Sequence, residues 1–252
     1  MPTRLIDCES HATETSHELL VLAFHKIGLP PAGSESTWFY IPDSVFDGYL
    51  KELRDSTWQV IDAGTFVEGL SRPETLPQRS ALLTFDDGYC SMLHTAVPLM
   101  SAYGFPSVVF VPTSFVGDTN RFDRDVEPEE PICGWDDLLE MQRTGVSVQS
   151  HGVSHRHLSE LGVDQLRYEL RESKSVLEAR LGQAVTIFSF PYGDDGSDVE
   201  ATAAELCQAG YRAALLYGGG SERVPPASCY RLSRLAMGAD TNLLAILQKG
   251  ET

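Results

Sequence analysis

The sequence is poor in cysteine. Its 252 residues include five cysteines, an odd number, and none of them belongs to a C-x-x-C pair. A disulfide framework needs paired cysteines and a zinc knuckle needs closely spaced ones, so the sequence predicts neither. So few thiols are typical of a protein in the reducing cytoplasm.

Positive charge and long apolar runs are also scarce. Lysine and arginine number 19 against 36 aspartates and glutamates, which gives a net charge of −17. The resulting field repels polyanions, which argues against a nucleic-acid partner and against an anionic membrane surface. The best apolar run, LLVLAF at 19–24, ends at His25. It is too short for a membrane helix, so we expect no membrane insertion.

The first 18 residues have the composition of a polar N-terminal extension. They contain neither the basic start nor the apolar run of a signal peptide. We therefore expect an extension over 1–18, one domain over 19–252 and a cytoplasmic location. Hydrophobic residues make up 42% of the chain, an ordinary globular proportion that allows a substantial core.

Short apolar runs alternate with amphipathic segments along the rest of the chain. The strand candidates are nearly continuous in apolar residues, which is typical of strands buried on both faces of a parallel sheet. They cover 19–24, 81–85, 107–111, 146–149, 185–190 and 213–217, and the helix candidates cover 46–53, 91–103, 135–143, 164–181 and 199–208. Repeated β–α units of this kind predict an α/β fold with a closed or nearly closed barrel in a single domain.

An acidic segment interrupts this alternation before the helix at 135–143. The stretch GDTNRFDRDVEPEEP at 117–131 is rich in acidic residues, contains proline and has few apolar side chains. That composition favours a solvated surface loop, and a rim of a substrate site is the alternative.

Two adjacent carboxylates follow the apolar run at 81–85. Unpaired buried carboxylates are costly, so such a pair at a strand end indicates a function or a partner. Successive side chains there point in opposite directions and Gly88 allows a sharp turn, so Asp86 and Asp87 can serve different tasks in one pocket. The alternative is an Asp-Gly turn, with Asp86 as the N-cap of the helix at 91–103.

Three histidines within seven residues follow the run at 146–149. His151 and His155 are four residues apart, so on a helical turn both rings point to one side and can bind one metal ion. Two histidines and one carboxylate, with an open position for water, form the ligand set of many catalytic divalent-metal sites. We therefore expect a divalent ion, with Zn²⁺ favoured and Co²⁺, Ni²⁺, Mn²⁺ and Fe²⁺ as alternatives.

Two further polar clusters end strand candidates, FPYG at 190–193 and FHKI at 24–27. Each alone is typical of a turn or an exposed strand terminus. The carboxyl ends of the strands gather at one end of a parallel α/β barrel, which is where its active site lies. Four polar clusters at four strand ends therefore predict one active site.

The order LLTFDDGY, SHGVSHRHL and FPYG resembles the NodB-homology polysaccharide deacetylases, which are metal-dependent carbohydrate esterases with a distorted (β/α) barrel. The resemblance extends over 19–235, and the paired-aspartate motif followed by the two-histidine motif is a highly specific combination. The opening LVLAFHKIG, the phrase GWDDLLEM at 134–141 and the form FPYG are similar to one branch, the poly-β-1,6-N-acetylglucosamine N-deacetylases. In that branch the family motifs are circularly rearranged.

The resemblance assigns roles residue by residue. Asp87, His151 and His155 match the metal ligands, and Asp86 matches the general base. Together they imply a water molecule activated by the metal and by Asp86, with a backbone N–H helping to stabilise the oxyanion. The implied walls of a sugar site, with ordinary core packing as the alternative, are Tyr192, Trp135 and Tyr89.

The sequence departs from the family pattern in two places. The arginine that usually precedes Pro-Tyr is missing from 188–190, so Arg231 or Arg234 would have to orient the base. The usual leucine-x-histidine near the C-terminus is also absent, because no histidine follows His157. The general acid must then come from elsewhere in the chain.

His25 is the expected general acid. His151 and His155 are committed to the metal, and His94 lies on the expected helix at 91–103, about two turns from the end of the strand at 81–85. His25 instead closes the first strand, where the other motifs gather, and imidazole has an unperturbed pKa near neutrality. The circularly rearranged relatives also place their acid histidine in such an N-terminal phrase. A surface histidine beside Lys26 is the alternative.

These observations favour a metal-dependent hydrolase that removes an N-acetyl group from an N-acetylated sugar or polysaccharide precursor. One alternative is hydrolysis of another small amide, such as a formamide or a cyclic imide, on the same barrel. A second alternative is a non-catalytic saccharide-binding homologue. The intact Asp86, Asp87, His151 and His155 argue against the second, because a binding module needs no base beside a metal.

Overall fold

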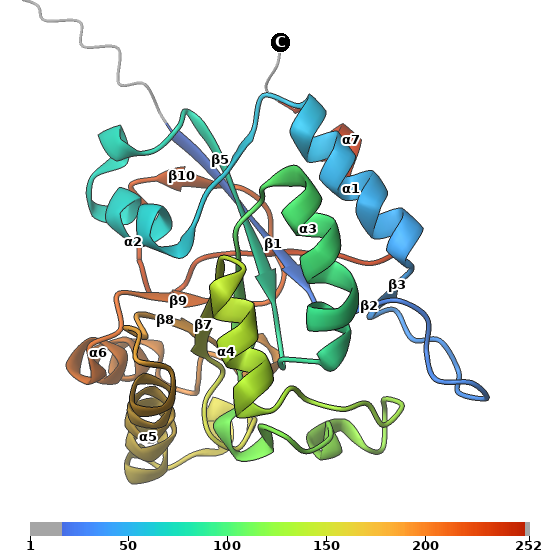
Figure 1. The fold of residues 1–252 in the computed structure, drawn as a ribbon. Helices are drawn as coiled ribbons and strands as arrows, with labels where there is room; N and C mark the ends of the chain where they lie inside the picture. The colour runs from blue at the N-terminus through green and yellow to red at the C-terminus, as the bar shows by residue number, and fades with distance from the viewer. Residues whose placement is uncertain (1–16, 250–252) are drawn as a thin grey trace, which may run out of the picture.

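The computed structural model describes residues 17–249, in which helices surround a curled, mostly parallel sheet (Figure 1). The strands are ordered β10, β1, β5, β6, β7, β8 and β9, and all neighbours are parallel except β10, which is antiparallel to β1. Their bounds are Glu222–Val224 for β10, His17–Phe24 for β1, Arg79–Phe85 for β5, Ser107–Val111 for β6, Val146–Ser150 for β7, Ile187–Ser189 for β8 and Ala213–Leu215 for β9. All six predicted strands are therefore present, although the fifth and sixth are shorter than expected.

Four shorter strands complete the β structure. Lys26–Ile27 (β2) pairs with Tyr40–Ile41 (β3) in a small separate sheet. Gln59–Val60 (β4) pairs with β5, and Leu235–Ala236 (β11) pairs with β1. The sequence did not predict these strands, because two residues are too few to show a period.

A C-terminal segment, residues 232–237, bridges the two ends of the curled sheet. Leu232 pairs with Leu215 of β9, and β11 pairs with Leu22 and Ala23 of β1. The distorted barrel is thus confirmed, with its first and last parallel strands joined through an irregular segment. The bridging segment has consequences for the site, because it carries Arg234 across the sheet.

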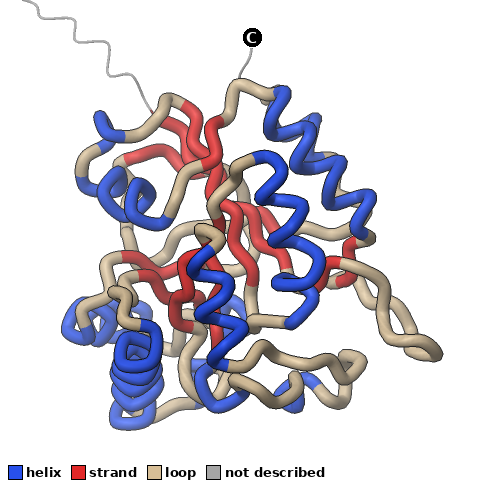
Figure 2. Tube along the Cα trace, viewed as in Figure 1, coloured by secondary structure: helices blue, strands red, loops and turns tan. Residues whose placement is uncertain are grey.

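Seven helices in the described chain lie around the outside of the sheet (Figure 2). They are Asp43–Asp55 (α1), Ala63–Ser71 (α2), Val97–Tyr103 (α3), Trp135–Arg143 (α4), Val163–Leu181 (α5), Val199–Ala209 (α6) and Leu243–Leu247 (α7). The sequence predicted five of them, and α3 with the π-helical turn Met92–Ala96 before it fills the expected helix at 91–103. It missed α2, whose two glycines disfavour a helix, and α7, which at five residues is too short to display a helical period.

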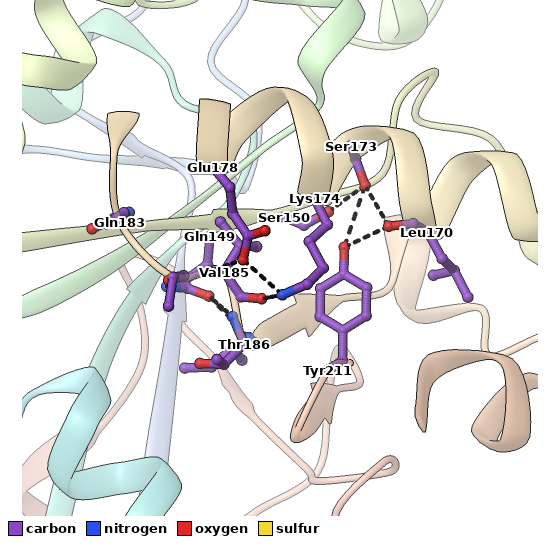
Figure 3. A network of polar contacts seen from close by, with 12 residues as sticks. Gln149, Ser150, Leu170, Ser173, Lys174, Glu178, Gln183, Val185, Thr186 and Tyr211 are labelled. Carbon is purple, nitrogen blue, oxygen red and sulfur yellow. Dashed lines mark hydrogen bonds and ion pairs between the residues drawn. The ribbon is translucent and has the colours of Figure 1, made fainter. Parts of the chain in front are cut away.

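A polar network fastens α5 to the sheet (Figure 3). The Ser173 hydroxyl accepts a hydrogen bond from Ser150 at 2.8 Å, and the Tyr211 hydroxyl donates to the Leu170 carbonyl at 2.9 Å. Because Ser150 is the last residue of β7, this contact fixes the helix against the strand that leads into the histidine motif. Such satisfied buried networks favour one packing arrangement over alternatives.

The expected N-terminal extension is only partly covered. Residues 1–16 lie outside the described residues, and His17 and Glu18 already belong to β1, so the first strand begins earlier than expected. Within residues 17–249, no helix combines the length and the hydropathy that crossing a bilayer requires.

Candidate active site

The polar clusters of the sequence meet at the carboxyl ends of the parallel strands, as expected for an α/β barrel. They line one cavity of about 220 Å³, and segments that follow β1, β5, β6, β7, β8 and β9 reach it. The lining residues are His25, Lys26, Phe39, Asp86, Asp87, Tyr89, Asp123, Val126, Glu127, His151, His155, Phe190, Tyr192 and Tyr217. This cavity is the candidate active site.

Asp86 and Asp87 leave β5 in different directions. Asp87 and Gly88 are both in the left-handed region, with φ of 71° and 76°, and this sharp turn separates the two carboxylates. Both side chains are nearly inaccessible, with exposures of 3% and 2%. The chain does turn at Asp-Gly, but Asp86 is engaged with Arg234 and does not cap the following helix.

Asp87, His151 and His155 bring three ligand atoms together. Asp87 Oδ1 lies 3.1 Å from His155 Nε2 and 3.5 Å from His151 Nε2, and all three residues are buried. Oδ1 of Asp87 has no hydrogen-bond partner among the described residues. A buried carboxylate oxygen facing two imidazole nitrogens suits a divalent ion, which would satisfy all three atoms.

The protonation of this group also suits a cation. Nδ1 of His151 lies 2.7 Å from the Ser189 carbonyl oxygen, to which Nδ1–H donates, so Nε2 is left free as a ligand. Burial lowers the pKa of His151 to about 4, which keeps the ring neutral near pH 7. Burial alone raises the pKa of Asp87, but His155 and the other nearby imidazoles outweigh it and hold that pKa below its usual value.

The spacing predicted that a helical turn brings the two histidines together, but the structure has no helix at this position. Residues 151–157 form an irregular loop, in which Gly152 and His155 have φ of 79° and 52°. This backbone brings the two rings to a centroid distance of 4.9 Å. The prediction of a shared site therefore agrees with the geometry, while the assumed helix was wrong because left-handed residues break a helical path.

Arg234 supplies the cation beside the expected base. Its Nη1 and Nη2 donate to Asp86 Oδ1 and Oδ2, each at 2.7 Å, and its Nη2 also donates to Ser189 Oγ at 2.8 Å. Burial alone raises the pKa of Asp86, but the guanidinium and the nearby His151 hold it below its usual value. Ser189, which accepts one of these hydrogen bonds from Arg234, lies in the stretch 188–190 where the expected arginine was missing.

Arg231, the other candidate, points elsewhere. Its Nε donates to Asp195 Oδ2 at 2.5 Å, and the side chain is about half exposed. The two arginines were equivalent in sequence, but the path of residues 232–237 directs only Arg234 into the interior. The structure thus shows which of the two arginines pairs with Asp86, which the sequence could not show.

His25 lies in the cavity against two aromatic rings. Its ring centroid is 4.5 Å from that of Phe39 and 5.3 Å from that of Tyr217. Burial lowers its pKa, although the carboxylates of Asp86 and Asp87 act in the opposite direction. Its Nδ1 has no hydrogen-bond partner within residues 17–249. His25 is therefore not a surface histidine beside Lys26, which was the alternative interpretation.

The three expected sugar walls occupy different positions. Tyr192 is partly exposed and lies against His155, at a centroid distance of 4.6 Å, while Tyr89 is buried in the cavity lining. Trp135 is absent from that lining: it packs against the hydrophobic core, with the Arg180 guanidinium 5.4 Å from its ring centre. The expected role of Trp135 is therefore corrected, because its side chain packs against the core and does not line the cavity.

The acidic segment at 117–131 forms part of the site. Asp123, Val126 and Glu127 line the cavity, and Glu127 is joined to the buried Lys26 by a 2.7 Å ion pair. The Tyr192 hydroxyl donates to Asp123 at 3.0 Å. The favoured interpretation as a solvated loop was therefore wrong, because composition does not reveal that these acidic groups have partners in distant segments.

Several lining residues were not predicted individually. Phe39 and Tyr217 come from segments that carry no recognisable motif, whereas Lys26 stood in the cluster at 24–27 and Asp123 and Glu127 stood in the acidic segment whose alternative was a substrate rim. The spacing of residues along the chain did not indicate that Phe39 or Tyr217 would line the site. The fold alone brings them to the cavity.

Comparisons with known proteins add independent findings. The family model for polysaccharide deacetylases matches residues 74–214, more than half of the chain. YxkH of Bacillus subtilis, which is named as a polysaccharide deacetylase, is 25% identical over 181 residues, which cover 72% of this chain and 59% of that protein. The poly-β-1,6-N-acetyl-D-glucosamine N-deacetylase of Staphylococcus aureus is 22% identical over 164 residues, which cover 62% of this chain and 54% of that protein. The similarity thus spans less than two thirds of either relative.

A solved structure shares the fold over nearly its whole length. The deacetylase PplD of Streptococcus pyogenes, solved in complex with acetate, gives a TM-score of 0.79 at 20% identity. The similarity covers 92% of this chain and 99% of that one. At this level of identity the likeness establishes the fold.

Proposed function

The chain belongs to the polysaccharide deacetylase family, and we propose that it is a metal-dependent hydrolase that removes N-acetyl groups from a saccharide. One observation carries the proposal. The buried group Asp87, His151 and His155 lies beside a second carboxylate, Asp86, that a buried arginine holds ionised. A metal-binding site alone would not need that second carboxylate.

The three-residue group is the proposed metal site. A divalent ion held there would acidify a water molecule and polarise the acetyl carbonyl. Zn²⁺ is favoured by the two imidazoles and one carboxylate, with Co²⁺, Ni²⁺, Mn²⁺ and Fe²⁺ as alternatives. His151 would bind through Nε2, because its Nδ1–H is already donated to the Ser189 carbonyl.

Asp86 is the proposed general base. Its pKa lies below the usual carboxyl value, so the group is ionised near neutral pH and able to take a proton from the attacking water. Arg234 fixes the carboxylate plane through two parallel hydrogen bonds. This pairing orients the base in the way the missing family arginine would be expected to do.

His25 is the proposed general acid. Amide hydrolysis requires protonation of the leaving amine, and a positioned acid contributes a factor of about 10²–10⁴ to the rate. His25 lines the same cavity as the metal group and approaches it from the end of β1. Its lowered pKa makes the protonated ring a stronger acid than an exposed histidine.

The proposed substrate is an N-acetylated sugar or a polysaccharide precursor. The similarity to a poly-β-1,6-N-acetyl-D-glucosamine N-deacetylase supports an N-acetylglucosamine unit. Tyr192 and Tyr89 provide aromatic surfaces in the cavity against which a sugar ring can pack. The cytoplasmic location expected from the sequence stays a prediction.

The test combines metal analysis with acetate release. The purified protein is assayed on N-acetylated sugars, sugar nucleotides and oligomers, with formamides and cyclic imides as the competing amides. We expect about one divalent ion per chain and acetate release from an N-acetylated saccharide. Turnover of only the simple amides would favour the alternative hydrolase, and saccharide binding without any turnover would favour the non-catalytic homologue.

A further inference from the structure

The loop that carries both histidine ligands has an unusual backbone. Gly152 and His155 are both left-handed, and residues 151–157 have no regular secondary structure. A left-handed non-glycine residue costs about 1–2 kcal/mol, so other contacts must hold His155 in this conformation. The contacts that hold this loop therefore determine where the ligand lies.

A buried carboxylate on α5 makes those contacts. Glu169 is 6% exposed, and its Oε2 accepts the backbone N–H groups of Val153 and Ser154 at 2.6 and 2.9 Å. Its Oε1 accepts a short hydrogen bond from the Ser154 hydroxyl. Within residues 17–249, Glu169 has no ion-pair partner, so these donors are what compensates its burial. Burying a charged group is costly, and hydrogen bonds from backbone N–H groups offset that cost.

The two histidines depend on this carboxylate to different degrees. His151 is fixed independently, because its backbone N–H donates to the Val111 carbonyl at 3.1 Å and its ring Nδ1 lies 2.7 Å from the Ser189 oxygen. His155 has no such ring hydrogen bond, since its Nδ1 lacks a partner among the described residues, and its ring is held only by packing against Phe122 and Tyr192, at centroid distances of 4.0 and 4.6 Å, and by its approach to Asp87 and His151. His155 directly follows Ser154 in the chain, so Glu169 restrains the backbone of His155 through its hydrogen bonds to Ser154.

We propose that Glu169 is a positioning residue that sets His155 opposite Asp87 and His151 before the ion binds. The inference rests on the proposed function, because it requires a divalent ion at that group. Without the charged carboxylate, the three donors of Val153 and Ser154 share at most one neutral acceptor, so the hydrogen bonds weaken and the loop can relax from the left-handed turn. Replacing a group that orients a metal ligand without touching the metal typically changes metal affinity about 10–100-fold.

The same helix provides a matched control. Glu178 also accepts a backbone N–H, from Val185 at 3.0 Å, and pairs with Lys174 at 2.9 Å (Figure 3). It fastens α5 to the segment before β8 and has no hydrogen bond to the histidine loop among the described residues. Replacing either glutamate with glutamine removes one acceptor oxygen from α5 at nearly constant volume. Only the Glu169 change acts on the loop of the metal site.

The experiment compares Glu169→Gln and Glu178→Gln with the wild type. Zn²⁺ affinity is measured by competition with a chromophoric chelator, and the melting temperature of each metal-free protein is measured separately. We expect Zn²⁺ to bind about 10–100-fold more weakly to Glu169→Gln and within about twofold of wild type to Glu178→Gln. The melting temperatures show how much stability each variant loses, which matters because Glu178 is 37% exposed and Glu169 only 6%. Equal affinity in Glu169→Gln and the wild type, or an equal loss in both variants, would overturn the proposal.

A milder variant keeps the test decisive if Glu169→Gln does not fold. Ser154→Ala removes one of the three hydrogen bonds to Glu169 and leaves the helix unchanged. A several-fold loss of Zn²⁺ affinity in this variant supports the proposal, and unchanged affinity contradicts it.

The affinity readout also separates this inference from the proposed function. Weakened Zn²⁺ binding in Glu169→Gln, with no acetate release from any saccharide by the wild type, would support the positioning role and refute the deacetylase. Acetate release by the wild type, with unchanged affinity in Glu169→Gln, would do the opposite. A wild type that binds no divalent ion would refute both.

Discussion

Arg234 donates two parallel hydrogen bonds to Asp86, each at 2.7 Å, across 148 residues of sequence. The arginine is fully buried and the aspartate is 3% exposed. Removing one partner of a buried pair leaves an uncompensated charge, which costs more than the pair itself contributes. The relationship therefore supports both the stability of the fold and the ionised state of the base.

The first prediction concerns this pair. Arg234→Met should destabilise the protein by about 3–5 kcal/mol at pH 7, because Asp86 would stay buried without its cation. The lowered pKa of Asp86 in the fold means that its stabilising contribution is present above the unfolded pKa, about 3.9, and is lost as the pH falls. In the variant that pKa rises, so the acidic limb of the pH–rate profile should move to higher pH.

Urea unfolding and the pH–rate profile test this prediction together. Arg231→Met is the matched control, because that exposed arginine pairs with Asp195 at the surface and should contribute at most about 1 kcal/mol. An equal loss of stability in both variants would show that the buried Arg234–Asp86 pair contributes no more to stability than the surface Arg231–Asp195 pair.

The second prediction separates the adjacent aspartates. Asp86→Asn should abolish turnover and leave the metal bound, because a base is lost but no ligand is. Asp87→Asn should lose most of the metal together with the activity, because it removes a charged ligand. Metal content and acetate release of each purified variant provide the measurement. Equal metal loss in both would contradict this division of roles.

The third prediction concerns His25. His25→Ala should lose the alkaline limb of the pH–rate profile with an N-acetyl substrate, because no acid is left to protonate the leaving amine. An activated ester, whose leaving group needs no proton, should be hydrolysed at nearly the wild-type rate. An unaltered rate on the amide would rule out the acid role.

The fourth prediction concerns the metal-free protein. Burial lowers the pKa of His151 to about 4, whereas the unfolded chain takes up this proton below pH about 6.5. Stability from the neutral ring is therefore present above pH about 6.5 and is lost as the pH falls toward 4, by on the order of 3 kcal/mol. Urea unfolding of the chelator-treated protein across this range provides the measurement.

Two variants check the origin of that pH dependence. His151→Gln should reduce it, because this titrating group is gone, while His25, whose pKa burial also lowers, remains. His94→Gln should retain the wild-type dependence, because His94 is exposed on the turn before α3. A wild-type slope in His151→Gln would mean that other groups cause the acid sensitivity.

The motifs predicted much of the site because each lies within a few residues of a strand end. Asp86, Asp87, His151 and His155 could be grouped from the sequence alone, since parallel strands place their carboxyl ends on one edge. Trp135 could not be placed in this way, because its motif begins a helix and the direction of a helix face depends on packing. The acidic segment at 117–131 was misjudged for a related reason: Lys26, the partner of Glu127, lies about 100 residues earlier.

By itself, the sequence determined the elements and the chemistry at their ends. Continuous apolar runs specify buried parallel strands, and residues close in sequence, such as Asp86 and Asp87, remain close in any fold. Only the tertiary structure decided which distant groups reach the cavity. Arg234 rather than Arg231 pairs with Asp86 because residues 232–237 bridge the sheet, and Glu169 holds the histidine loop because α5 packs against β7. Contacts of this kind depend on the direction of whole elements, which local spacing does not encode.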